Sequence, residues 1–125
     1  MPRDAAATDL VTGVLPAEVA YLCARCRRLV TRGRWRLAMG GDHDHVLFNP
    51  AGIVFRVVCF KEAPGAVTAG EASAQFTWFR GYSWRVAACA GCAAHLGWRY
   101  DGEGPPAVFF GLIKPMLVEE AETET

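Results

Sequence analysis

Two Cys-x-x-Cys pairs, Cys23 with Cys26 and Cys89 with Cys92, constrain the fold more than any other feature of the sequence. Two cysteines at this spacing can lie on a tight turn and present both sulfur atoms to one ion. Four thiolates complete the tetrahedral coordination of Zn²⁺, which is typical of a structural site. The sequence therefore predicts one structural zinc ion that is bound by these four cysteines and joins two distant hairpins. Such binding is worth roughly 10 kcal/mol or more.

Other interpretations of the cysteines are less well supported. A redox Cys-x-x-Cys would be accompanied by a β-α-β pattern, which neither pair shows. His95 follows Cys92 by three residues and could replace a cysteine ligand, but four well-spaced thiols favour a packing role for it. Cys59 lies in an apolar run, where a free cysteine behaves as a small hydrophobic residue.

Length and composition predict one domain with an apolar core, since 52% of the 125 residues are hydrophobic. The formal net charge is zero, so no overall field favours nucleic acid or an anionic membrane as a partner. The N-terminal sequence carries charges and no continuous apolar run, so we expect neither a signal peptide nor a membrane span. Reduced thiols and a cytoplasmic location follow. The expected divisions are a flexible lead-in at 1–15, a zinc-clamped domain at 16–118 and a disordered acidic tail at 119–125.

The pattern of apolar runs and turn residues predicts a mainly β protein, and no segment shows a long helical period. Asn49, Pro50 and Gly52 predict a turn between two strands. The expected elements are a hairpin of 29–30 with 35–37, strands at 46–48, 53–60 (largely buried) and 108–112, a long loop at 61–74, and an edge or terminal segment at 113–118.

The segment 76–100 contains three of the four tryptophans. We expect a hairpin over residues 76–86. A three-residue turn around Gly81 would set Trp78 opposite Trp84, whereas a two-residue turn would send these side chains to opposite faces.

Trp98 and Tyr100 are two residues apart and should share one face of the next strand, so the aromatic side chains could close a box. Such a box suits either a cation held over the ring faces or a flat neutral ring between them. No acidic residue lies within 76–100, which favours the neutral ring.

Two further groups of polar residues have ordinary explanations. His43 and His45 lie in a Gly- and Asp-rich segment, where solvated loop histidines are expected more often than a second metal site. The arginines between Arg25 and Arg36 could contact phosphate, but the zero net charge favours a solvated surface.

Taken together, these motifs resemble the thalidomide-binding (CULT) domain of the cereblon family. The resemblance runs from Cys23 to about Pro115 and is specific. Its signature consists of the two Cys-x-x-Cys pairs, Asn49-Pro50 with Gly52, W-F-x-G-Y-x-W (Trp78 to Trp84), C-x-x-C-x-x-H-x-G-W (Cys89 to Trp98) and Tyr100. The length is that of a small, single-domain bacterial-type member.

The resemblance implies two antiparallel sheets meeting at an angle (a β-tent), pinned by zinc. It implies that Trp78, Trp84 and Trp98 enclose a glutarimide or similar cyclic imide. In the family the imide N–H donates to a backbone carbonyl, here that of Phe76, and the backbone N–H of Trp78 donates to an imide carbonyl. The remaining implied contacts are Tyr100 at the cage base, Asn49, Pro50 and Phe55.

Uracil-like rings and cyclised protein C-termini are further ligands that the family suggests. Animal relatives carry His in place of Phe76 and Phe in place of Tyr100. Recruitment of ubiquitin-ligase substrates is not implied, because the sequence shows neither the protease-like domain nor the adaptor surface of full cereblon.

Two competing functions belong to other classes. A methionine-sulfoxide reductase of the zinc-bearing type resembles the chain at Cys89 to Gly97, but that chemistry needs a nucleophilic cysteine in a late strand and none follows Cys92. A reader of methyl-ammonium groups would use the same cage through cation–π contacts. We therefore expect a binding module rather than an enzyme.

Overall fold

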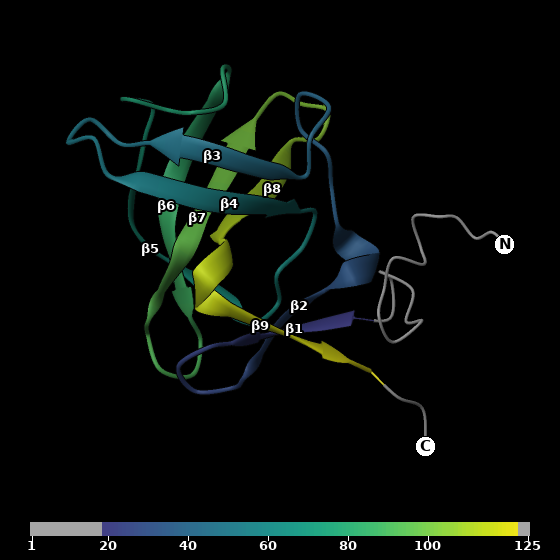
Figure 1. The fold of residues 1–125 in the computed structure, drawn as a ribbon. Helices are drawn as coiled ribbons and strands as arrows, with labels where there is room; N and C mark the ends of the chain where they lie inside the picture. The colour runs from purple at the N-terminus through teal and green to yellow at the C-terminus, as the bar shows by residue number, and fades with distance from the viewer. Residues whose placement is uncertain (1–18, 123–125) are drawn as a thin grey trace, which may run out of the picture.

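The computed structural model describes residues 19–122 (Figure 1). The predicted lead-in at 1–15 lies outside this part of the chain. Helical structure in the described residues is limited to two 3₁₀ turns, η2 (Gly33–Trp35) and η3 (Lys114–Met116). The strands are β1 (Val19–Cys23), β2 (Leu29–Arg32), β3 (Asp44–Phe48), β4 (Val54–Phe60), β5 (Ala66–Ser73), β6 (Tyr82–Cys89), β7 (His95–Gly102), β8 (Val108–Ile113) and β9 (Leu117–Ala121).

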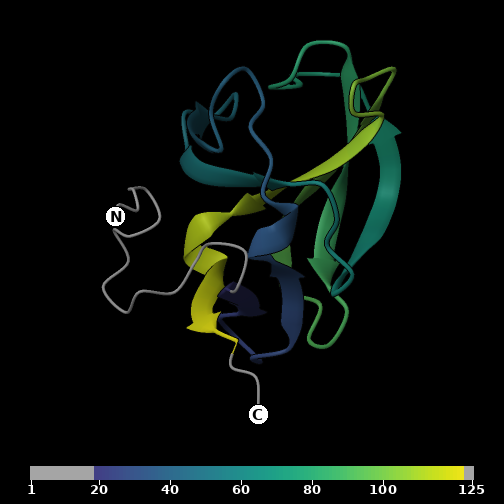
Figure 2. The same ribbon diagram turned by 90° about the vertical axis from the view of Figure 1, so that its right-hand side faces the viewer.

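These strands form two antiparallel sheets, which confirms the predicted mainly β class. The smaller sheet has the order β2-β1-β9, and the larger has the order β3-β4-β8-β7-β6-β5. The smaller sheet lies at the bottom in both views (Figures 1 and 2), whereas β3 and β4 cross steeply in front of β6, β7 and β8 in Figure 1. Strand β8 joins the two halves of the larger sheet, because it pairs with both β4 and β7. The larger sheet therefore bends around an inner face.

Two predicted features of the N-terminal half need correction. Residues 29–30 and 35–37 do not form a hairpin. Instead β2 pairs with β1, η2 follows β2 directly, and Arg36 bridges to Phe60. The β1–β2 hairpin therefore encloses the first Cys-x-x-Cys turn.

The predicted long loop at 61–74 contains an eight-residue strand, β5, which pairs with β6 at the edge of the larger sheet. Most residues of β5 are exposed, and it is built from three Ala with one each of Val, Thr, Gly, Glu and Ser. Five of its eight residues are Ala, Gly or Glu, which are depleted in strands, so the pairing with β6 rather than the local sequence makes this segment a strand.

The hairpin expected over 76–86 is wrong, since only its second half is a strand. β6 begins at Tyr82, and the preceding residues form turns, with the Tyr82 N–H donating to the Phe79 carbonyl at 3.0 Å. Trp78 therefore reaches its place from a loop, and strand parity does not decide which way it points.

The remaining elements agree more closely with the predictions. The turn at 49–52 is present, with Gly52 at φ +84°. β4 is buried only from Val57 to Phe60, so the expectation of a largely buried strand holds for its second half alone. The predicted acidic tail begins too early, because Glu119 to Ala121 continue β9 and pair with β1. The described residues contain no helix that is both long and apolar enough to cross a membrane.

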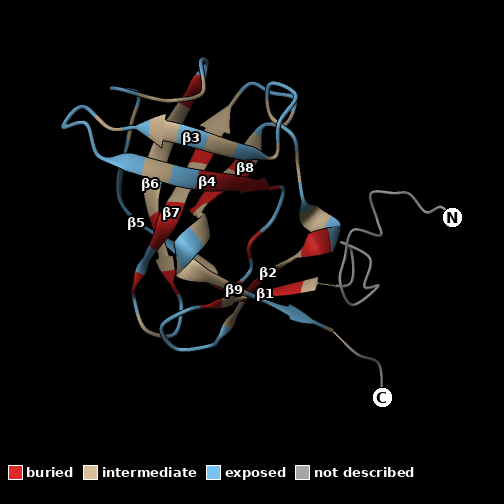
Figure 3. Cartoon of the chain, viewed as in Figure 1, coloured by how far each residue is buried: buried red, intermediate tan, exposed pale blue. Residues whose placement is uncertain are grey.

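The interior holds two groups of buried side chains (Figure 3). One lies beside the cysteine pairs and includes Cys23, Cys89, Phe60 and Leu96. The other consists of Cys59, Tyr82, Tyr100 and Phe109, and three partly buried residues of the predicted cage segment (Phe79, Trp84 and Trp98) pack against it. Each candidate site therefore rests on its own part of the core.

Candidate functional site

The two Cys-x-x-Cys pairs adopt the same local backbone structure. In the first, Cys23 ends β1, the Arg27 N–H donates to the Cys23 carbonyl at 2.7 Å, and Arg27 has φ +69°. In the second, Cys89 ends β6, the Ala93 N–H donates to the Cys89 carbonyl at 2.8 Å, and Ala93 has φ +66°. A left-handed residue directly after each pair closes the turn and directs both sulfur atoms to one side. One pair belongs to each sheet, so the cluster joins the sheets.

All four Sγ atoms lie within 4.8 Å of one another. Cys23 and Cys92 are separated by 3.7 Å and Cys26 and Cys89 by 3.6 Å, Sγ to Sγ. These separations far exceed a disulfide bond of about 2.0 Å. They are close to the roughly 3.8 Å edge of a tetrahedron whose centre lies about 2.3 Å from each sulfur. The geometry therefore fits four thiolates around one metal ion.

Hydrogen bonds among the four thiols shift the pKa values of Cys26 and Cys89 in opposite directions. Burial raises the pKa of Cys89, but hydrogen bonds from the backbone of Cys92 and Gly91 and from neighbouring thiols outweigh it and lower the pKa to about 7. The backbone of Arg28 lowers the pKa of Cys26, but desolvation and hydrogen bonds with the other three thiols raise it to about 11. Cys89 therefore loses its proton more readily than Cys26. A dication would replace those protons and stabilise four thiolates together.

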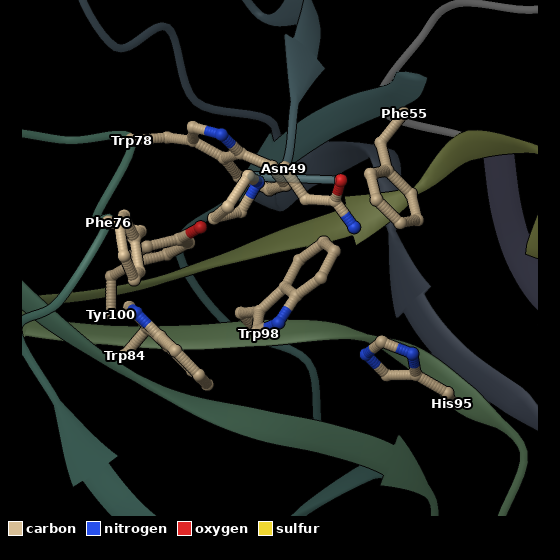
Figure 4. Close-up of a pocket in the computed structure, with 9 residues that line it drawn as sticks. Asn49, Phe55, Phe76, Trp78, Trp84, His95, Trp98 and Tyr100 are labelled. Atoms are coloured by element: carbon tan, nitrogen blue, oxygen red, sulfur yellow. The ribbon is translucent and has the colours of Figure 1, made fainter. Parts of the chain in front are cut away.

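A pocket of about 280 Å³ opens on the inner face of the larger sheet (Figure 4). Its volume lies just below the roughly 300–1,000 Å³ of sites for drug-sized molecules, so it suits one small ring. The structure brings all eight residues predicted as ligand contacts to this pocket and adds a ninth. The lining consists of Asn49, Pro50, Phe55, Phe76, Trp78, Trp84, Trp98 and Tyr100, with His95 as the addition.

Two indole hydrogen bonds fix the loop that carries Trp78. The Trp78 Nε1–H donates to the Phe48 carbonyl at 2.6 Å, which ties the loop to the end of β3. The Trp84 Nε1–H donates to the Gln75 carbonyl at 2.9 Å, which ties β6 back to the same loop. Phe76, between these anchors, has φ +55° and is 73% exposed. Both indole donors are therefore used within the protein, so they hold the wall in place rather than contact a ligand.

The aromatic wall has a defined geometry. Trp78 and Trp98 meet edge to face at 4.9 Å between ring centroids, with an interplanar angle of 87°. Phe55 lies 5.8 Å from Trp78 and 5.4 Å from Trp98. Trp84 lies apart from this trio across the pocket (Figure 4). The edge-to-face contact of Trp78 and Trp98 forms a corner of the pocket (the Trp78–Trp98 corner). A flat ring would therefore lie between Trp84 and this corner.

The floor of the pocket is rigid. Tyr100 is 1% exposed and stacks on Phe109 at 4.9 Å with an interplanar angle of 16°, and Phe79 meets Tyr100 edge on at 4.9 Å. Burial raises the pKa of the Tyr100 hydroxyl, with a further contribution from Cys59, so this group stays protonated and neutral. At the rim, Asn49 Oδ1 accepts the backbone N–H groups of Ala51 and Ile53, both at 2.9 Å, which fixes the turn.

His95 is the pocket residue that the sequence did not reveal. Its Nε2–H donates to the Gly97 carbonyl at 3.0 Å, and its ring meets Trp98 edge to face at 5.0 Å. Strand parity places residues 95 and 98 on opposite faces, but a bulge breaks that parity: Ala87 pairs with Gly97 and Ala88 pairs with His95. The glycine within an apolar strand was the available signal, because such glycines often mark bulges.

His43 and His45 do not form a second metal site in the described residues, where the four cysteines are the metal-binding group found. His43 packs against Phe60 and His45 against Phe79, each edge to face at 5.3 Å. Both imidazoles therefore pack against the core and are less solvated than expected.

Comparison with known proteins places this arrangement in a family. No protein-family model matches the chain. Over 83% of its length, it is 47% identical to protein cereblon of Drosophila melanogaster and 33% identical to protein cereblon of Drosophila persimilis. The matched segment is 19% and 18% of those relatives, so the chain spans about a fifth of the proteins it matches. A ligand-binding domain fits this homology together with the aromatic cluster and the four clustered cysteines. Through the matched segment, the chain belongs to the cereblon family, as its motifs predicted.

Proposed function

We propose that the chain is a binding module whose tryptophan cage holds a cyclic imide or uracil-like ring, such as glutarimide or the imide of thalidomide-type compounds. The single observation that carries the proposal is the 280 Å³ pocket between Trp84 and the Trp78–Trp98 corner. A flat ring with apolar methylenes can lie against the indole faces, and its polar edge can pair with the backbone of Phe76 and Trp78.

The ion in the cysteine cluster is proposed to be one structural Zn²⁺. A set of four thiolates favours zinc over harder cations, and a complete tetrahedron leaves no open coordination position for catalysis. The ion would hold the ends of β1 and β6 together. Since β6 carries Trp84 and continues into β7 with Trp98, the clamp supports one side of the cage.

A neutral ligand is favoured over a methyl-ammonium group. No Asp or Glu lines the pocket among the residues that the structure describes, so a cation would enter an apolar site without a counter-charge. Cation–π attraction to the indoles remains the basis of the competing proposal.

Binding is also favoured over catalysis. Cys59 is the one cysteine outside the metal cluster; it is fully buried, and burial raises its pKa to about 12. A reductase of the methionine-sulfoxide type needs an accessible thiolate, which Cys59 does not offer. Binding of cyclised protein C-termini belongs to the same proposal, since a cyclic imide at a chain end presents the same ring. A cytoplasmic location is also part of the proposal.

Calorimetry with three ligands tests this function. Glutarimide should bind with one site per chain, and N-methylglutarimide, which lacks the imide donor, should bind at least tenfold more weakly because the Phe76 carbonyl then loses its partner. Tetramethylammonium tests the competing cage function. The proposal would be contradicted if the protein bound tetramethylammonium but not glutarimide, or if it bound glutarimide and N-methylglutarimide with equal affinity.

A further inference from the structure

The first Cys-x-x-Cys turn carries three arginines and no acidic residue. Arg25, Arg27 and Arg28 are all exposed, and no carboxylate in the described part of the chain forms an ion pair with them. The sequence has no Asp or Glu between residues 19 and 41, and none in the second turn at 89–92. The positive charge at the first turn is therefore not balanced by acidic side chains of either turn.

The side chain of Arg28 reaches across to the second Cys-x-x-Cys turn. A Cβ atom added to Gly91 would lie 3.0 Å from Arg28 Cδ, 3.4 Å from Cys26 Sγ and 3.6 Å from Arg28 Cβ. Arg28 Cδ and Cys26 Sγ are therefore at most 6.4 Å apart, which is the sum of the first two distances. The alkyl stem of Arg28 thus packs on a glycine, and its guanidinium group starts one bond beyond Cδ.

The loaded metal cluster carries the opposite charge. Four thiolates around one dication leave two negative charges in excess. Cys23 and Cys89 are buried, whereas Cys26 is exposed, so a solvated side chain can approach the cluster from the side of Cys26. An arginine stem can lie on the protein surface while its charged group stays in water, so the approach of Arg28 costs little desolvation.

We propose that Arg28 supplies a counter-charge to the metal cluster and so raises its affinity for zinc. The inference rests on the proposed zinc ion and goes beyond it by naming a residue, outside the four ligands, that sets how tightly the ion is held. Gly91 takes part because it leaves the space that the Arg28 stem occupies beside Cys26. Coulomb attraction to the excess negative charge of the four thiolates is the physical cause.

The test is the zinc affinity of the full chain, measured by competition with a chromogenic chelator. Arg28→Gln removes the charge and should weaken zinc binding about fivefold at low salt, as expected for one solvated charge contact. The loss should nearly disappear at about 1 M salt, where the Debye length is about 3 Å. Arg28→Lys keeps a positive charge on an alkyl stem and should restore most of the native affinity.

Arg85→Gln is the matched control. It removes the same charge from an exposed arginine of β6, four residues or about 13 Å along the strand from Cys89, and should leave the zinc affinity unchanged. Three results would overturn this inference and leave the proposed zinc ion intact: native affinity in Arg28→Gln, an equal loss in Arg85→Gln, or a loss that persists at high salt. A native chain that takes up no zinc would overturn both.

Discussion

Replacing Cys26 with serine is expected to remove most of the bound zinc and to leave the chain largely unfolded at 25 °C. The Cys26 side chain is exposed, so its loss costs little packing, and the effect measures the metal site itself. Structural zinc binding contributes on the order of 10 kcal/mol, which is comparable with the whole stability of a domain of this size. Elemental analysis and thermal unfolding followed by circular dichroism would measure both effects.

Cys59→Ala is the matched control for that experiment. It also removes one of the five thiols, but Cys59 lies in the other group of core residues, away from the cysteine cluster. This variant should retain one zinc ion per chain and unfold cooperatively. If Cys26→Ser kept its zinc and its thermal midpoint, Cys26 would not be a metal ligand, which would contradict the four-thiolate site.

Truncating Trp98 to alanine is expected to weaken glutarimide binding at least thirtyfold, or about 2 kcal/mol, which is the effect typical of a central aromatic contact. Trp98 contacts Trp78, Phe55 and His95, so its removal opens one corner of the cage. Trp84→Ala removes the opposite wall and should have an effect of similar size. Titration by calorimetry gives both affinities.

The folded state of these variants must be checked separately. Zinc content and the unfolding midpoint should show that each variant keeps its fold, since both indoles are only partly buried. Trp35→Phe is the control, because Trp35 packs on the other core group and does not line the pocket. Unchanged glutarimide affinity in a folded Trp84→Ala variant would show that this indole is not part of the binding site.

The metal cluster could be predicted from sequence because its geometry is local. Each Cys-x-x-Cys pair fixes its own turn. Two such pairs supply the four thiolates that one tetrahedral ion requires, so the sequence alone indicates that they come together. The same holds for the turn at 49–52, where Asn49, Pro50 and Gly52 each favour the observed backbone. The family resemblance then supplied the grouping of the aromatic residues.

The features that were missed depend on contacts between distant residues. β5 is a strand because β6 offers it an edge to pair with, not because its Ala, Gly and Glu residues favour a strand. Trp78 joins the cage through a hydrogen bond to Phe48, thirty residues away, rather than through the expected hairpin. His95 reaches the pocket because of the bulge before Gly97, which alternation of side chains along a regular strand does not foresee.

A crystal structure of the zinc-loaded protein with glutarimide tests the central claim most directly. The ring should lie between Trp84 and the Trp78–Trp98 corner, with its N–H donating to the Phe76 carbonyl and one carbonyl accepting the Trp78 backbone N–H. A ring bound elsewhere, or three indoles closed on one another with no ring among them, would contradict the claim that this chain holds open a cage for a small planar heterocycle.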